Sequence, residues 1–133
     1  MKKLFLTATI SFSIIFSTNC VAEWKLISQN LKGTKFFVET SSIKNREDYT
    51  YYWMLYSHSK PVLGDFSNRS LYQTDCKEPL KQKILDGAYF DGLMANGKMT
   101  TRLSQKYLAK AGFEYAPPGS VLEKLLSFVC NLK

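Results

Sequence analysis

The chain has 133 residues, of which 45% are hydrophobic and 22% are charged, and its formal net charge is +7. This composition is typical of a globular domain, and it excludes a low-complexity or repeat chain. The positive charge argues against an inhibitor of a basic lysozyme, because such an inhibitor should be acidic to complement its target.

The first residues have the order of a secretory signal peptide. Two lysines precede an apolar run over residues 4–16, and small or polar residues follow as far as Ala22. The run is shorter than the roughly 20 residues that cross a bilayer. We therefore expect a signal peptide at residues 1–22, cleavage between Ala22 and Glu23, and no integral membrane span in the mature chain.

The cysteine inside this segment offers a second interpretation. Cleavage in front of Cys20 would leave a lipidated cysteine, but the peptidase that cuts there needs a small residue before it, and the chain has Asn19. Loss of Cys20 with the signal peptide is favoured. The remaining residues 23–133 are enough for one domain with a modest core. Loss of the two signal lysines takes the formal charge from +7 to +5.

Extended segments dominate the first two thirds of this domain. The pattern of aromatic and β-branched residues predicts strands, with a polar turn-like stretch over 41–48, and the predicted strands are 24–28, 35–40, 49–58, 70–76 and 81–93. Pro61 and Gly64 are expected to end the third strand. Gly87 and Gly92 are expected at bulges or turns, and Asn96-Gly97 is a hairpin signal.

Two helices are expected near the carboxyl end. Residues 103–111 have helical spacing, although a strand or loop is an alternative, and Gly112 is a plausible stop. The final helix is the clearest element, because Ser120 can cap it and Glu123 completes a capping box. Its apolar residues fall on one stripe, which consists of Val121, Leu122, Leu125, Leu126, Phe128, Val129 and Leu132.

Two cysteines remain after export, and we expect them to form a disulfide. In an oxidising compartment, two remaining cysteines such as Cys76 and Cys130 normally form a disulfide. On the chain-entropy model this disulfide stabilises the folded state by about 4 kcal/mol. Cys130 lies beside the apolar stripe of the final helix. The predicted fold is therefore α+β, a small antiparallel β-sheet with a C-terminal α-helix packed on one face and one disulfide.

The aromatic strand 49–58 is apolar on both faces, which a sheet with one helical cover does not require. The face of Tyr52, Met54 and Tyr56 is our candidate binding surface or homodimer interface, because tyrosine suits interfaces. Intramolecular cover by other parts of the chain is the alternative. A double substitution of Tyr52 and Tyr56 by serine would distinguish these interpretations.

A second candidate binding region is basic. Lys77, Lys81 and Lys83 follow the first disulfide cysteine and could attract sulfated glycans, phosphate-bearing lipid heads or acidic protein stretches. A solvated sheet edge that discourages aggregation is the alternative. Nucleic acid is not expected as a partner, because the chain is exported and the cluster has no interleaved aromatics.

No pattern in the sequence points to catalysis. His58 is the only histidine, and its place at a strand end indicates a surface residue rather than part of a triad. Asp86 and Asp91 are the candidate acid–base pair, and solvent-facing residues beside glycines are the simpler interpretation. No phosphate loop or metal-ligand spacing is present. We therefore predict a non-enzyme with no catalytic residues, no metal and no cofactor.

The order of these features resembles a known family. An early tryptophan, KFFVET followed by Ser-Ser-Ile, the Trp53 strand, the stretch 72–76 (YQTDC) and Pro-Gly-Ser before the final helix are similar to the surface-adhesin protein E family of Gram-negative bacteria. The family has a tryptophan before Pro-Gly-Ser, where this chain has Phe113 and Tyr115. The resemblance implies an antiparallel sheet with a disulfide-tied C-terminal helix, export to the cell envelope, and binding of host extracellular matrix or plasma proteins.

Together these observations predict a non-enzymatic exported envelope protein with adhesin-like binding of host or surface macromolecules. A small periplasmic inhibitor or a structural protein of unknown ligand is the alternative. The periplasm, the outer-membrane surface and the external medium all remain open as its location.

Overall fold

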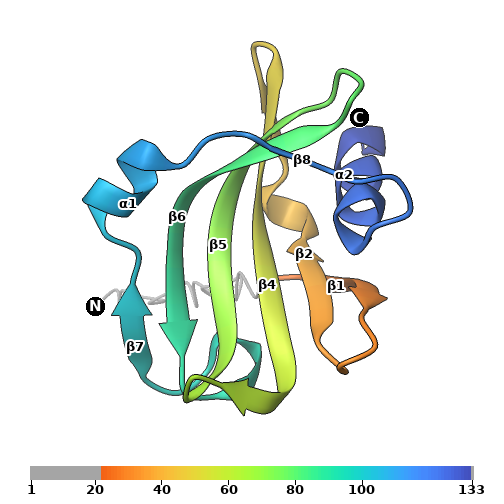
Figure 1. Ribbon diagram of the computed structural model, residues 1–133. Coiled ribbons are helices and arrows are strands. Elements are labelled where there is room, and N and C mark those ends of the chain that lie inside the picture. Colours follow the sequence, from red (N-terminus) through yellow and green to blue (C-terminus); the bar gives the residue numbers. More distant parts are fainter. Residues whose placement is uncertain (1–21, 133) are drawn as a thin grey trace, which may run out of the picture.

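A computed structural model describes residues 22–132 (Figure 1). The predicted signal peptide falls almost wholly on residues 1–21, which lie outside the described residues. The strands are β1 (Trp24–Gln29), β2 (Lys35–Glu39), β3 (Lys44–Arg46), β4 (Tyr49–Val62), β5 (Asp65–Asp75), β6 (Lys81–Phe90), β7 (Met99–Arg102) and β8 (Glu114–Tyr115). The α-helices are α1 (Gln105–Lys110) and α2 (Val121–Asn131), and the 3-10 helices are η1 (Thr40–Ser42) and η2 (Leu93–Ala95).

All strands join one antiparallel sheet in the order β1-β2-β4-β5-β6-β7, while β3 pairs with β4 and β8 pairs with β6. Figure 1 shows α1 and α2 on the same side of this sheet, towards its two lateral edges. The predicted α+β fold, an antiparallel sheet with a C-terminal helix on one face, is therefore confirmed. No helix within residues 22–132 is long and apolar enough to span a membrane.

The start of α2 is fixed by two local hydrogen bonds. Ser120 Oγ accepts a bond from the Glu123 amide at 3.1 Å, as predicted for an N-cap. Glu123 Oε2 accepts instead from the Gly119 amide at 3.1 Å, one residue before the position that a capping box uses. The helix buries Leu125, Leu126 and Val129, which are at most 1% exposed.

The hydrophobic core lies between α2 and the sheet. The buried residues that form it come from β2, β4, β5, the segment before β6 and α2, and they are Val38, Tyr52, Met54, Tyr72, Leu80, Leu125, Leu126 and Val129. Cys76 directly follows β5 and Cys130 lies in the last turn of α2, and the two form the predicted disulfide with a Cα–Cα distance of 5.6 Å. The bridge therefore ties the helix to the sheet that it covers.

Several strands differ from their predicted bounds, and β5 begins at Asp65, five residues before its predicted start at Ser70. The polar stretch 41–48 was predicted as a turn, but it holds most of η1 and all of β3. Strand β3 forms because β4 is long enough to pair with two strands on the same side, with β2 at residues 54–57 and with β3 at residues 49–51. Pro61 does not end β4, which continues to Val62. The β4–β5 register is irregular between Ser57 and Val62, so the missing amide of Pro61 costs no regular ladder bond.

The glycine positions are close to their predicted roles. The β5–β6 register shifts opposite Leu85, two residues before Gly87, which places the bulge beside that glycine. Strand β6 ends at Phe90, earlier than predicted, and Leu93 belongs to η2. Gly97 has a φ of 80°, within the connection that brings β7 back along β6. The predicted helix over 103–111 is α1, with Ser104 as its cap.

Candidate binding surfaces

The face of Tyr52, Met54 and Tyr56, which the sequence predicted as a binding surface, lies mostly in the interior of the protein. Tyr52 and Met54 are 0% and 1% exposed and belong to the core under α2. The expected exposed interface is therefore wrong for these two residues, and intramolecular cover is what the structure has. Only Tyr56 lies at the margin of the core. Its partly buried ring packs edge-to-face against Phe36, with the two ring centroids 4.8 Å apart.

The three lysines do not form one free patch. Lys77 Nζ lies 3.5 Å from an Asp48 carboxylate oxygen, and Lys81 Nζ lies 3.5 Å from one of Asp75. The Lys81 ammonium also lies over the Phe113 ring, 5.3 Å from its centroid. Two of the three predicted charges are thus already paired. The alternative of a solvated sheet edge does not hold for Lys81 either, because β6 pairs with β5 on one side and with β8 on the other at this residue.

The remaining candidates for chemistry have structural partners. His58 Nδ1 is hydrogen-bonded to Thr34 Oγ1 at 3.0 Å, and burial lowers the pKa of the imidazole while the Asp65 charge opposes that shift. Arg102 donates to both oxygens of Asp86, at 2.8 and 3.3 Å, and these hydrogen bonds hold the pKa of that carboxyl below its usual value. Asp91 accepts from the Lys98 amide at 2.7 Å.

Within residues 22–132, histidine, cysteine, aspartate and glutamate side chains form no group of three that could hold a metal ion.

The side of the sheet away from α2, which we call the back face, carries an aromatic and basic cluster. Strand alternation places Trp53 and Leu55 opposite the core-facing Tyr52 and Met54, and Arg69 pairs with Leu55 across β4 and β5. The Arg69 guanidinium lies 4.3 Å from the Trp53 ring centroid and 5.9 Å from that of Trp24.

The Arg69 guanidinium is also held by an ion pair. Its Nη2 lies 3.7 Å from Glu39 Oε2, and the Arg69 side chain remains 41% exposed. Stacking on the two indoles and this pair hold Arg69 at the surface in a defined position. We call Trp24, Glu39, Trp53 and Arg69 the Arg69 cluster.

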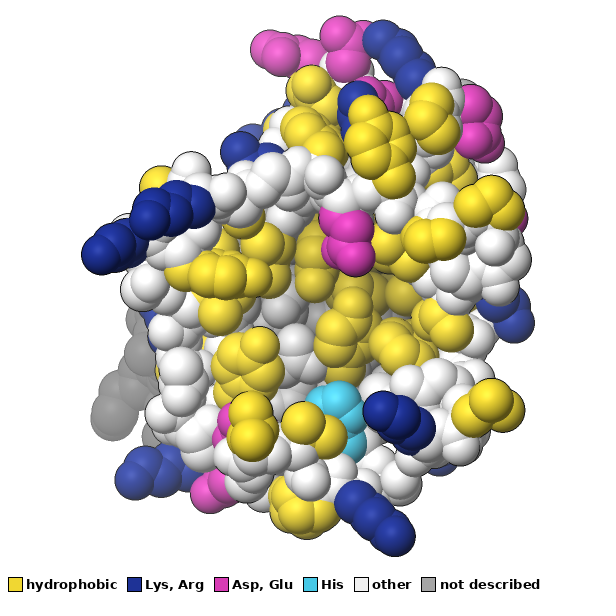
Figure 2. All heavy atoms as spheres, in the orientation of Figure 1, with side chains coloured by type: hydrophobic (Ala, Val, Ile, Leu, Met, Phe, Trp, Pro, Cys, Tyr) yellow, Lys and Arg dark blue, Asp and Glu magenta, His cyan; other side chains and the backbone are white. Residues whose placement is uncertain are grey.

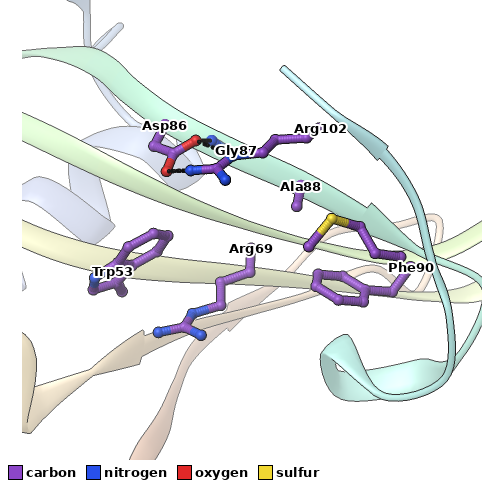
Figure 3. Close-up of a pocket in the computed structure, with 8 residues that line it drawn as sticks. Trp53, Arg69, Asp86, Gly87, Ala88, Phe90 and Arg102 are labelled. Carbon is purple, nitrogen blue, oxygen red and sulfur yellow. Dashed lines mark hydrogen bonds and ion pairs between the residues drawn. The ribbon is translucent and has the colours of Figure 1, made fainter. Parts of the chain in front are cut away.

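Two hollows on the back face meet at this cluster. One of about 500 Å³ is lined by Trp53 and Arg69 together with Lys44 and Arg46 of β3, and both of those basic residues are exposed. The other, of about 220 Å³, extends toward Phe90. Figure 3 shows Trp53, Arg69 and Phe90 around it, with the Asp86–Arg102 pair at its edge.

The side of the sheet that carries α1 and α2 holds a separate depression, which we call the front groove. One hollow of about 230 Å³ is bounded by Tyr107 and Ala111 at α1, and one of about 320 Å³ by residues of α2. Both are lined by Gln82 and Glu114, so they adjoin at β8. Figure 2 shows hydrophobic side chains gathered in this hollowed part of the molecule.

Tyr56 and Tyr72 line the groove, and Tyr52 is fully buried behind Gln82. Tyr52 donates a hydrogen bond to Gln82 Oε1 at 2.6 Å, and both residues are almost fully buried. Burial raises the pKa of Tyr72 to about 12, and it raises the pKa of Tyr52 and of Tyr56 well above the usual value. These phenols are therefore neutral hydroxyl groups at physiological pH.

Sequence reasoning missed both the Arg69 cluster and Glu114. A signal for the first existed, because Trp53 shares its face with two tyrosines and only one face of the strand can meet α2. No local signal identified Glu114, since its position depends on β8, a strand of two residues that pairs with the distant β6.

Comparison with known proteins confirms the family expectation. The family model described as surface-adhesin protein E matches residues 24–131. No curated protein matches the chain.

Solved structures of Haemophilus influenzae protein E share the fold. One has a TM-score of 0.62 at 12% identity over 85% of this chain and 87% of the other. A second crystal form gives 0.61 at 12% identity, over 85% and 91%. Protein E from non-typeable Haemophilus influenzae gives 0.57 at 12% identity, over 85% and 78%. The match of the family model over nearly all described residues establishes that the chain belongs to the surface-adhesin protein E family.

Proposed function

We propose that this chain is exported to the cell envelope and acts there as a non-enzymatic adhesin, which binds host extracellular matrix or plasma proteins through its back face. The observation that carries this proposal is the Arg69 cluster, in which two tryptophans and the Arg69–Glu39 ion pair lie on the sheet side that neither α1 nor α2 covers.

The chemistry of the cluster suits recognition of a macromolecule. Tryptophan, tyrosine and arginine are enriched where protein interfaces derive most of their binding energy. Arg69 is already held by Trp53 and Glu39, so it loses little conformational freedom when a partner binds. The larger hollow on the back face, about 500 Å³, also exceeds either hollow of the front groove in volume.

The charge around the cluster suggests which part of a partner it meets. Lys44 and Arg46 are exposed at the larger hollow, and Lys83 lies on the same face of the neighbouring β6. Such a set attracts acidic segments of proteins and accelerates association at low ionic strength. We therefore expect binding to weaken when salt is added.

Family membership supports binding rather than catalysis. The family description names a surface adhesin, and the described histidine and aspartates have the structural partners given above. The alternative is that the back face forms a homodimer. The molar mass of the protein in solution distinguishes a monomer with a free back face from such a dimer.

A charge-reversal variant tests the proposal. The variant Lys44→Glu/Arg46→Glu alters exposed side chains of a short strand, so it leaves the core intact. We expect the association rate with a panel of immobilised host matrix and plasma proteins to fall about tenfold, because the electrostatic attraction is reversed. Biolayer interferometry at low and physiological salt measures this rate.

The matched control is Lys106→Glu/Lys110→Glu on α1, which makes the same charge change on the opposite side of the sheet. This control should retain binding close to that of the parent chain. Equal losses in the two variants would mean that only net charge matters, and would overturn the assignment to the back face. Binding of the parent to no member of the panel would overturn the adhesin function itself.

A further inference from the structure

We propose that the front groove is a binding site for a small organic cation, a protonated amine that carries an aromatic or branched alkyl body. The ammonium group would lie beside Glu114, and the body would occupy the hollows on the groove floor. This site lies on the opposite side of the sheet from the Arg69 cluster and does not depend on the adhesin function.

The floor offers apolar and aromatic surface. Phe36 and Tyr56 line the hollow next to α2, while Tyr72 and Ile84 line the hollow next to α1. Apolar lining with few polar groups is what small-molecule sites have in common. Aromatic ring faces also attract cations, and they do so most strongly where the cation is partly desolvated.

The polar part of the floor is rigid. Gln82 is 2% exposed and lines both hollows, and the Tyr52 hydroxyl holds its carbonyl oxygen at 2.6 Å. A buried amide held by a buried phenol keeps its orientation, so the groove is formed before a ligand arrives. Preformed sites lose less entropy on binding.

The sign of the charge selects a cation. Glu114 is the only charged side chain among the described residues that line the two hollows. Across residues 22–132, no basic side chain forms an ion pair with Glu114. Burial is the main cause of the raised pKa of Tyr56 and of Tyr72, and the negative charge of Glu114 adds to it. The groove is thus an acidic site on a chain whose net charge is positive.

The size of the hollows favours a small molecule over a folded partner. The hollow next to α1 has a volume of about 230 Å³, and the hollow next to α2 has a volume of about 320 Å³. A lysine side chain of a peptide has related chemistry, but it has no aromatic or branched body to occupy the second hollow. The experiment must therefore distinguish binding of a peptide from binding of a small organic cation.

Three probes of similar shape test the proposal on the mature protein. 2-Phenylethylammonium, 2-phenylethanol and phenylacetate are titrated while amide resonances are followed by NMR. We expect shifts at β8 and the start of β6, with the ammonium probe bound about tenfold more tightly than the alcohol, as a charge-assisted hydrogen bond implies, and phenylacetate bound least.

Variants of the acidic residue complete the test. Glu114→Gln should make the ammonium and alcohol probes bind equally, and Glu114→Lys should reverse the preference toward phenylacetate. Glu114 is exposed on a strand of two residues, so neither change disturbs the core. Glu47→Gln is the control, because it removes the same charge from the exposed β3–β4 turn, and it should keep the tenfold preference.

Three results would overturn the proposal. Equal binding of the ammonium and alcohol probes to the parent chain would leave only an apolar hollow. Loss of the preference in Glu47→Gln as well would make the effect one of net charge. Shifts produced by a lysine-containing tripeptide but not by 2-phenylethylammonium would assign the groove to peptides. Binding to matrix proteins through the back face would be unaffected by any of these.

Discussion

Cys76 at the end of β5 and Cys130 in the last turn of α2 are joined by a disulfide, with their Cα atoms 5.6 Å apart. This bond ties the carboxyl-terminal end of the helix to the sheet, while the backbone after β8 joins its amino-terminal end. The helix also covers Tyr52 and Met54, so the bridge holds in place the element that closes the core.

Replacement of both cysteines by serine should lower the stability of the domain. The bridge closes a loop with a sequence separation of 54, and its loss should reduce the free energy of unfolding by about 3–4 kcal/mol. Urea denaturation of the mature protein measures the change, with the parent chain in the absence of reductant as reference. An unchanged midpoint and slope would show that α2 needs no covalent tie.

Removal of one buried hydroxyl should have a measurable cost. Tyr52→Phe leaves Gln82 Oε1 without its 2.6 Å donor inside the core, and an unsatisfied buried acceptor costs about 1–3 kcal/mol. Tyr115→Phe is the matched control, because Tyr115 is 56% exposed and should lose almost nothing. Similar denaturation midpoints for the two variants would contradict the role given to the Tyr52–Gln82 bond.

Stability should fall in alkaline solution. The unfolded chain releases tyrosine protons near pH 10, whereas folded Tyr72 keeps its proton up to about pH 12. The folded state then binds more protons than the unfolded state, so this contribution is complete below about pH 10 and is lost toward about pH 12. Each such tyrosine contributes a slope of up to about −1.4 kcal/mol per pH unit.

Urea denaturation at about pH 8 and about pH 11 tests this dependence across the unfolded tyrosine pKa. The Tyr72→Phe variant should show a shallower decline than the parent chain, because one raised pKa is gone. If the free energy of unfolding fell equally in the two proteins, groups other than Tyr72 would cause the loss of stability at high pH.

Export should leave a defined amino terminus. If the signal peptide is cut between Ala22 and Glu23, the intact mass of the product corresponds to residues 23–133 with two hydrogens missing for one disulfide. An added lipid mass on a chain that begins at Cys20 would replace this account with that of a lipoprotein. Intact-mass spectrometry before and after reduction distinguishes the two.

Local patterns were sufficient to predict the longer strands and α2, while the pairing of the cysteines followed from their number. Ser120 and the apolar stripe define α2 by short-range rules, and only two cysteines were left to pair after export. The aromatic run after Tyr49 consists of residues that favour strands. The strands and α2 are thus indicated by residues close together in the chain.

The orientation of β4 could not be predicted in the same way. Tyr51 and Trp53 on one face are as apolar as Tyr52 and Met54 on the other, so alternation does not say which side α2 covers. Strands β3, β7 and β8 were also missed, because each is short and is defined by its pairing rather than by its own sequence. The two candidate binding surfaces depend on such pairings.

Covalent footprinting of a complex with a bound matrix protein tests the central claim most directly. An amine-reactive reagent labels exposed lysines, and mass spectrometry compares each site in the free and bound chain. The account predicts that Lys44 and Lys83 on the back face lose reactivity while Lys106 and Lys124 on the helices keep theirs. Protection of Lys106 and Lys124 with Lys44 still fully reactive would contradict it.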